Sequence, residues 1–267
     1  MTKWLLAATL ALILPMGKAD AHEFWIDPPA FLIATDDTLT ADLRVGQEFS
    51  GATMSYLPRN FVRFDVVQGD AATPVEGRFG DIPALSMDGL VDGLAIIVHQ
   101  TTANNLTWSE WERFVGFAEH KDLGDVAQMH ADRGISQENV REDYIRYAKS
   151  LVAVGDGAGA DRVVGLRTEL VALANPYTDD VSGGMPVQLW LDGALVPDVQ
   201  VELFDRAPDG EVTITTHRTN AEGVALLPVA AGHVYMADSV TLEAVEPTAE
   251  SDAVWVTLWA NLTFAVP

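Results

Sequence analysis

Apolar and polar residues alternate through much of the first hundred positions, a pattern typical of β-strands. Residues 22–27 place His22, Phe24 and Ile26 on one face, and Pro28-Pro29 ends that strand. Further short strands with alternating or β-branched residues are expected at 39–45, 61–67 and 94–101. The pattern predicts an antiparallel β domain that begins at residue 22.

The period changes near position 104, and we expect a helical insert over about 104–150. Ser109 and Glu112 have the spacing of a capping box, ahead of apolar residues at helical intervals. A second short helix would carry His130 on its apolar face. A third helix, starting after Ser136, would align Val140, Tyr144, Tyr147, Ala148 and Leu151.

Strand patterns return at 162–173 and again after Ser182-Gly183-Gly184, which we take as a domain boundary. The apolar face expected for the last strand consists of Val254, Val256, Leu258, Ala260, Leu262 and Phe264. The predicted fold is mainly β, with two β-sandwich domains. Residues 22–182 would carry the helical insert, and residues 183–267 would form an immunoglobulin-like sandwich of short strands separated by turns.

The first 21 residues have the features of a secretory signal peptide. Lys3 precedes an apolar run of about a dozen residues, and Ala19-Asp20-Ala21 supplies a small-residue cleavage site. The run is shorter than the roughly 20 apolar residues that span a membrane. We expect cleavage after Ala21, which leaves a periplasmic protein without membrane insertion that begins at His22.

Composition narrows the classes of partner and of chemistry. The chain has no cysteine, and its formal charge of −23 becomes −24 when residues 1–21, with Lys3, Lys18 and Asp20, are removed. Such an acidic surface repels nucleic acid and anionic lipid. The chain contains neither G-x-S-x-G nor H-E-x-x-H, and it offers no thiol nucleophile. These features favour a protein that is not an enzyme.

A mature terminus at His22 would itself be a metal chelate, because one residue would supply an α-amine and an imidazole. The two groups titrate near about 7.7–8.0 and about 6.5, so both can be freed for a metal around neutral pH. Imidazole nitrogen suits nickel, copper, zinc and cobalt. A selective site needs at least one further donor. The alternative is that His22 is only the first residue of a strand.

His120 and His130 are the candidates for further ligands, because they lie ten residues apart in one compact helical insert. Each also has an ordinary structural interpretation. His120 would complement the dipole at the end of the first helix, and His130 would be a core residue. The remaining histidines, His99, His217 and His233, are expected to be structural or exposed.

Three motifs in order are similar to those of one known family. They are "AHEFWIDP" at 21–28, "REDYIRYAKSL" at 141–151 and "GLRTELVALANPY" at 165–177, followed by an immunoglobulin-like tail. The chain resembles the exported family of unknown function that is associated with nickel and cobalt uptake transporters. That resemblance implies a periplasmic component of cobalt-type ABC systems, and its early histidine corresponds to His22. The positions of His120 and His130 are not features of that family, and Ala172 stands where we expect proline.

The leading interpretation is a periplasmic, non-enzymatic component that binds Ni(II) or Co(II) for an inner-membrane uptake transporter, with His22, His120 and His130 as candidate ligands. One alternative is a copper enzyme that uses the same terminal histidine to oxidise a polysaccharide. Another is a cell-envelope interaction module without metal. The cofactor expected under the first interpretation is a divalent transition metal, nickel or cobalt, with copper as a further candidate.

Overall fold

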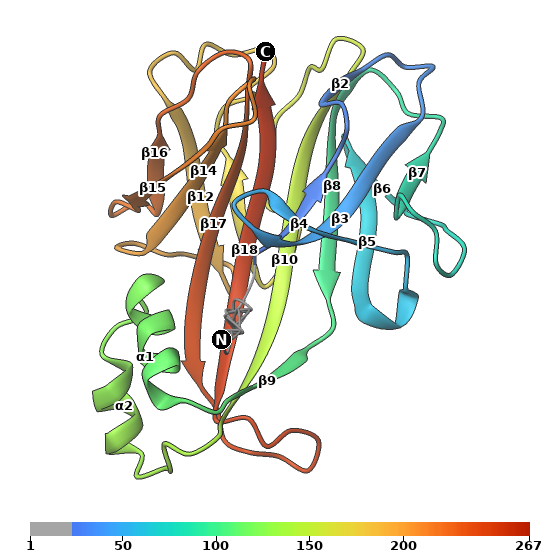
Figure 1. The fold of residues 1–267 in the computed structure, drawn as a ribbon. Coiled ribbons are helices and arrows are strands. Elements are labelled where there is room, and N and C mark those ends of the chain that lie inside the picture. The colour runs from blue at the N-terminus through green and yellow to red at the C-terminus, as the bar shows by residue number, and fades with distance from the viewer. Residues whose placement is uncertain (1–22) are drawn as a thin grey trace, which may run out of the picture.

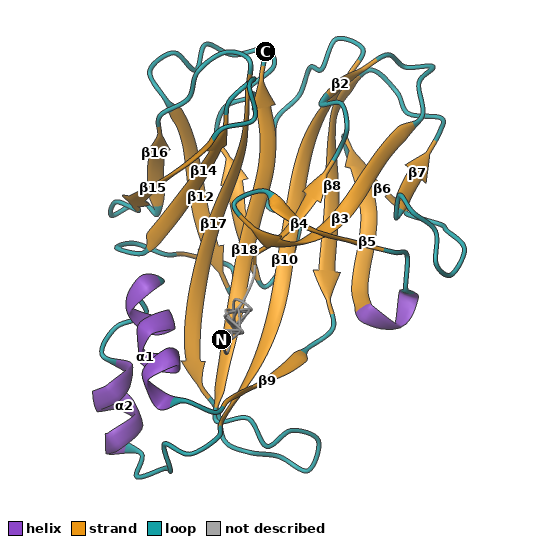
Figure 2. Ribbon diagram, viewed as in Figure 1, coloured by secondary structure: helices purple, strands orange, loops and turns teal. Residues whose placement is uncertain are grey.

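The computed structural model describes residues 23–267, so the expected signal peptide and His22 lie outside the described residues. Strands hold 49% of the residues and helices 8%, which confirms the mainly β prediction. Figures 1 and 2 show the arrangement. Within the described range the strands are β1 (Glu23–Asp27), β2 (Leu32–Ile33), β3 (Leu39–Gln47), β4 (Ser50–Met54), β5 (Phe61–Gln68), β6 (Ala71–Pro74), β7 (Leu85–Met87), β8 (Gly93–Thr101), β9 (Asn104–Trp108), β10 (Val140–Val154), β11 (Thr168–Ala172), β12 (Met185–Leu191), β13 (Ala194–Leu195), β14 (Gln200–Arg206), β15 (Val212–Arg218), β16 (Val224–Leu227), β17 (His233–Ala244) and β18 (Trp255–Val266). The helices of residues 23–267 are α1 (Trp111–His120), α2 (Val126–Asp132) and the short 3-10 helix η1 (Pro58–Asn60).

One large sheet organises the molecule. Among the described residues it contains ten strands, in the order β15-β14-β17-β18-β10-β8-β5-β6, with β2 and β9 also paired to β10. Its centre is the pair β10–β18, which runs parallel, whereas β17–β18 and β10–β8 are antiparallel. The smaller sheet with β1, β3, β4 and β7 belongs to the N-terminal half, and the one with β11, β12, β13 and β16 belongs to the C-terminal half. The layout is that of two sandwich-like halves that share one sheet.

The segment predicted as a third helix is strand β10, so that prediction was wrong. From Arg146 to Val154 every residue of β10 is buried. Tyr147 and Leu151 pack in one apolar cluster, and Ala148 and Val152 pack in another on the opposite face. A strand buried on both faces loses the alternation of period two, and its apolar residues then match helical spacing by coincidence.

The helical insert is therefore limited to α1 and α2, within residues 111–132. The expected capping box is also absent from α1, because Glu110 is its N-cap and makes no side-chain capping bond. Asp125 does cap α2 by accepting a hydrogen bond from the backbone N–H of Gln128. In Figure 1 both helices lie at one end of the molecule, beside the end of β17. No helix of residues 23–267 has the length and apolar character needed to cross a membrane.

The expected boundary at Ser182-Gly183-Gly184 does not separate two sets of strands. Strand β11 precedes it and β12 follows it, and the two pair antiparallel. The main apolar core also crosses this point, since Ile96 and Leu151 share a cluster with Leu203 and Leu262. By contrast, the predicted apolar face of the last strand is confirmed, because the residues from Val256 to Phe264 at every second position belong to that core.

Candidate functional site

The central strands place a row of polar side chains on the face of the large sheet opposite the main core. Leu258, Ala260 and Leu262 of β18 point into that core, so Asn261 points to the other face. Glu202 of β14 lies opposite Asp238 of β17, and Asp238 lies opposite Asn261. Directly opposed residues of neighbouring strands share a face. The three side chains therefore form one row.

Lys121, the residue that follows α1, directs its ammonium onto this row. Its Nζ lies 3.1 Å from Oε1 of Glu23 and 3.7 Å from Oδ2 of Asp238, and it donates a hydrogen bond to Oε2 of Glu202. The Lys121 side chain is only 4% exposed. Nζ also lies 4.9 Å from the centre of the Trp259 ring, a cation–π contact. We call this group the Lys121 cluster, and its members are Glu23, Lys121, Glu202, Asp238 and Asn261.

Charge in the Lys121 cluster is unequally matched, with three carboxylates around one ammonium. Burial alone would lower the pKa of Lys121, but the charges of Asp238, Glu202 and Glu23 outweigh it and raise that pKa above its ordinary value. Burial raises the pKa of Asp238 to about 7, although the Lys121 charge opposes the shift. Arg146 adds a second positive charge that acts on Asp238 and Glu23. The cluster is a buried, strongly polar environment.

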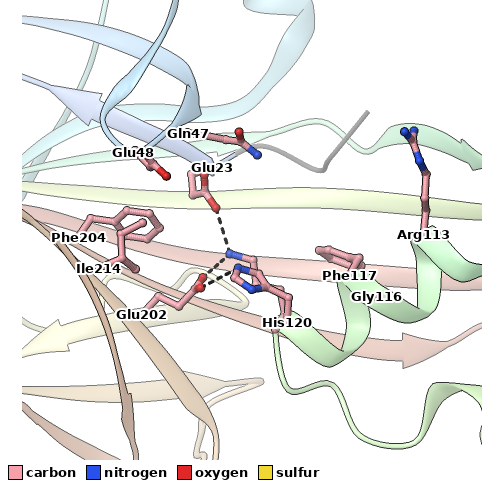
Figure 3. Close-up of a pocket in the computed structure, with 11 residues that line it drawn as sticks. Glu23, Gln47, Glu48, Arg113, Gly116, Phe117, His120, Glu202, Phe204 and Ile214 are labelled. Carbon is pink, nitrogen blue, oxygen red and sulfur yellow. Dashed lines mark hydrogen bonds and ion pairs between the residues drawn. The ribbon is translucent and has the colours of Figure 1, made fainter. Parts of the chain in front are cut away.

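The cluster opens to solvent through a pocket of about 560 Å³. Glu23, Lys121 and Glu202 line it together with His120, Glu48 and Phe117. Figure 3 shows Glu23 from β1 and Glu202 from β14 approaching the same point from opposite sides, with His120 beside Glu202. The volume lies within the usual range for ligand sites, roughly 300–1,000 Å³.

His120, one of the predicted ligands, lines this pocket. Its Nε2 is 3.1 Å from Oε1 of Glu202, and its side chain is 67% exposed. The two oxygens of Glu202 thus have different partners, since Oε2 accepts from Lys121. The carbonyl of His120 accepts a hydrogen bond from the side chain of Gln200, which fixes the end of α1 against β14. The exposed imidazole and one oxygen of the buried Glu202 carboxylate form a pair of donors at the pocket.

His130 does not join this pocket, and its proposed role as a ligand needs correction. It is fully buried, and it packs against the rings of Trp111 and Trp255. Its Nδ1 accepts a hydrogen bond from Nε1 of Trp255, and its Nε2 lies 3.0 Å from the carbonyl oxygen of Ser136. Both ring nitrogens are engaged within the protein, so neither is left for a metal. The core interpretation of His130 fits this geometry.

Within residues 23–267, no group of three or more His, Cys, Asp or Glu side chains has the geometry to hold a metal ion. The described residues contribute the pair His120 and Glu202, and further donors would have to come from elsewhere. Glu23, which stands next to the predicted mature terminus, has its carboxylate at 3.1 Å from Lys121. The pocket is therefore within one residue of the expected chelate along the chain.

Comparison with known proteins identifies the family. The model of the family described as Domain of unknown function (DUF4198) matches residues 19–243. The chain belongs to this family. The match to DUF4198 includes Glu23, Lys121, Glu202 and Asp238, whereas Asn261 lies beyond it. No curated protein matches the chain.

Sequence reasoning on this DUF4198 chain found His120 but missed the buried charges beside it. Glu202 stands between Val201 and Leu203 in the buried part of β14, and Asp238 lies in the buried part of β17. A carboxylate within an apolar strand is the signal that was available, because buried charges are rare unless they are paired. The partner, Lys121, could not be found from spacing, since it comes from a helix end about 80 residues away in the chain.

Proposed function

We propose that the processed chain binds a divalent transition metal in this pocket, with nickel or cobalt as the intended ion. The amine and imidazole of His22 would supply two nitrogen donors, His120 a third, and Oε1 of Glu202 an oxygen donor. The protein would act in the periplasm as a binding component for an uptake transporter. The family resemblance supports the link to nickel and cobalt transport, and the pocket supports the ligand set.

One observation carries the proposal: the pocket that contains the His120–Glu202 pair also has the residue after the expected terminus in its lining. Glu23 lines the same pocket as His120 and Glu202. Consecutive Cα atoms are about 3.8 Å apart, so His22 is covalently held next to Glu23. His22 and His120 together would then bring the nitrogen count to three.

The donor set also agrees with the proposed ions. Neutral imidazole and amine nitrogens suit nickel, cobalt, copper and zinc, whereas calcium and magnesium prefer oxygen ligands. The contact of 3.1 Å between His120 Nε2 and Glu202 Oε1 places a nitrogen and an oxygen close enough to bind one ion together. Copper binds more tightly than nickel to most nitrogen sites, so affinity alone does not identify the physiological ion.

The test is a calorimetric nickel titration of natively exported protein, at pH 8 and at pH 6. We compare it with a variant that has one extra residue ahead of His22, with His22→Ala and with His120→Ala. The extra residue converts the amine to an amide and leaves both imidazoles intact. We expect each change to weaken nickel binding at least about tenfold, since even supporting groups around a metal contribute about 10–100-fold.

The pH dependence separates this site from one made of carboxylates. Nickel must displace protons from the amine and the imidazoles, so affinity should fall steeply between about pH 8 and pH 6. A carboxylate site would hold its metal until roughly pH 4–5. Nickel binding of the extended protein that equals the native one at pH 8 would show that the terminal amine is not a ligand.

Delivery to a transporter needs a separate measurement. Cells that express the transporter and the native protein should accumulate more nickel or cobalt from micromolar medium than cells with the His22→Ala variant. Equal accumulation with both proteins, at equal protein levels, would contradict a role in uptake even if the protein binds metal in solution.

A further inference from the structure

The Lys121 cluster brings together more acceptors than its single ammonium can satisfy. An ammonium has three hydrogens. Nζ donates hydrogen bonds to Glu23 and Glu202, whereas Oδ2 of Asp238 lies farther away at 3.7 Å. The carboxylates come from three different strands, β1, β14 and β17, and converge on one point. The cluster has the oxygen-rich composition of a site for a hard cation.

Unsatisfied oxygen atoms in the cluster support this view independently. Among residues 23–267, Oε2 of Glu23, Oδ2 of Asp238 and Oδ1 of Asn261 are buried without a hydrogen-bond partner. Each of these side chains belongs to a residue that is more than nine-tenths buried. A buried oxygen without a partner costs free energy. We therefore look for a role of these buried oxygens in binding a cation or in excluding one.

We propose that Lys121 determines which metals the pocket accepts, by occupying with its own ammonium a cluster of oxygens that would otherwise bind a hard cation such as Ca²⁺ or Mn²⁺. Glu23, Asp238 and Oε2 of Glu202 are then neutralised from within the protein. The outer side of the pocket retains His120 and Oε1 of Glu202. Nitrogen-preferring metals are left with a site there, and oxygen-preferring metals are not.

The oxygen atoms around Lys121 are of the kind that hard cations prefer as ligands. Calcium takes six to eight oxygen ligands and accepts both monodentate and bidentate carboxylates. Without Lys121, the carboxylates of Glu23, Glu202 and Asp238 would surround the former position of Nζ, and Asn261 would lie beside Asp238. With Lys121 present, a divalent ion would have to displace a charge that is held by three carboxylates. Lys121 is thus a resident competitor for such ions.

The experiment uses Lys121→Met, which keeps an unbranched side chain but removes the terminal ammonium and its charge. We measure Tm with chelator and with 1 mM Ca²⁺ or Mn²⁺. Loss of the ammonium beside three buried carboxylates should lower the Tm of the variant in chelator. Either ion should then raise it by about 5 °C or more, through stabilisation by binding to the folded state. The Tm of the native protein should rise by less than about 1 °C when either ion is added.

Controls separate charge from packing. Lys121→Arg retains a cation and should respond to Ca²⁺ and Mn²⁺ as the native protein does. Lys121→Met combined with Asp238→Asn should lose most of the gain, because one of three carboxylates is gone. The proposal would be overturned if Ca²⁺ or Mn²⁺ raised the Tm of Lys121→Arg, or if neither ion raised the Tm of Lys121→Met. A Lys121→Met protein that stays unfolded in both ions would also overturn it.

The inference rests on the proposed function only where it assigns metal selectivity to the pocket. We therefore repeat the Ca²⁺ and Mn²⁺ measurements in a His22→Ala background. The hard-cation gain of Lys121→Met should persist there, since His22 is not among the oxygen donors. If nickel fails to bind the native protein but this gain persists, the nickel proposal fails and the role of Lys121 as resident cation stands. If nickel binds the native protein but neither ion raises the Tm of Lys121→Met, the nickel proposal stands and the role of Lys121 fails.

Discussion

Two lysines are buried among residues 23–267, and the carboxylates around them differ in whether their oxygens are saturated by hydrogen-bond donors. Lys149 in β10 is fully buried, with Nζ at 2.7 Å from Oδ1 of Asp161 and 3.5 Å from Oε2 of Glu169. It also donates to the carbonyl oxygen of Arg162 at 3.0 Å. Lys121 is buried to a similar degree, but it lies at a pocket and faces three carboxylates. We call Lys149, Asp161 and Glu169 the Lys149 cluster.

The carboxylates of the Lys149 cluster are saturated by backbone donors. Oε1 and Oε2 of Glu169 accept hydrogen bonds from the backbone N–H groups of residues 164–166. Asp161 accepts from the backbone N–H groups of Arg162 and Ala172. In the Lys121 cluster, by contrast, three buried oxygens lack such donors among residues 23–267. Burial of a lysine is common to both clusters, and saturation of its acceptors is what distinguishes a structural cluster from a candidate site.

The largest effect should come from Lys149→Met. Removing the ammonium leaves two buried carboxylates without their cation, and breaking a buried ion pair in this way costs about 3–5 kcal/mol. Urea unfolding should show this loss, and Ca²⁺ or Mn²⁺ should not restore it, because backbone donors already use the carboxylate oxygens. Arg78→Ala is the control: the Arg78 side chain is 94% exposed, so stability should change by less than about 0.5 kcal/mol. Cation rescue of Lys149→Met would remove the distinction between the clusters.

The buried carboxyl group of Glu142 extends the comparison, because its hydrogen-bond donors do not include a lysine. Its oxygens accept hydrogen bonds from the indole of Trp108 and the hydroxyl of Thr257, both neutral donors. Burial raises the pKa of Glu142 to about 7. The folded protein therefore holds a proton that the unfolded chain releases near pH 4.3. The stabilisation is complete below about pH 4 and is lost as pH rises through 7.

Glu142→Gln should remove this dependence. Between about pH 5 and pH 7 the native protein should lose up to about 1.4 kcal/mol per pH unit relative to the variant. The difference between the two proteins is the useful measure, because burial lowers the pKa of His99 to about 3 and this group acts in the opposite direction. Unfolding by urea at pH 5, 6 and 7 gives the difference directly. A constant difference over this range would mean that Glu142 is charged throughout.

The smallest stability effects should separate the two predicted histidines of the helical insert. His130→Phe keeps the ring between Trp111 and Trp255 but loses two hydrogen bonds, so it should cost about 1–3 kcal/mol. His120→Ala should cost less than about 1 kcal/mol, because its contact with Glu202 is exposed. Nickel affinity should show the reverse order. A His130→Phe protein with native stability and weakened nickel binding would restore His130 as a ligand.

Sequence patterns predicted the elements whose two faces differ. The apolar face of β18, the short strand near residues 39–45 and α1 ending at His120 all follow from periodicity. The strand near residues 94–101 is buried on both faces and was predicted from its β-branched residues instead. The pattern failed at β10, where both faces are covered and no polar side remains to set the period. It also failed to show that one sheet joins the two halves of the chain. Pairing partners depend on tertiary contacts that a local pattern does not contain.

The candidate site could be predicted only in part for the same reason. His120 was found because imidazoles are few and chemically distinctive. The Lys121 cluster combines residues from β1, the end of α1, β14, β17 and β18, so it exists only once the sheet has formed. Charged residues are numerous in this acidic chain, and composition does not show which of them are buried together.

The position of β18 has a consequence for the order in which the molecule folds. This strand is the last in sequence, yet it lies between β10 and β17, and every one of its residues is buried. Glu142 of β10 pairs with Trp255, a partner more than one hundred residues later. Contacts of such high sequence separation slow folding, because a long loop must close before they form. The central sheet cannot close until residues 255–266 have been synthesised, so nascent chains that stop before them should remain open to chaperones and to transport in an unfolded form.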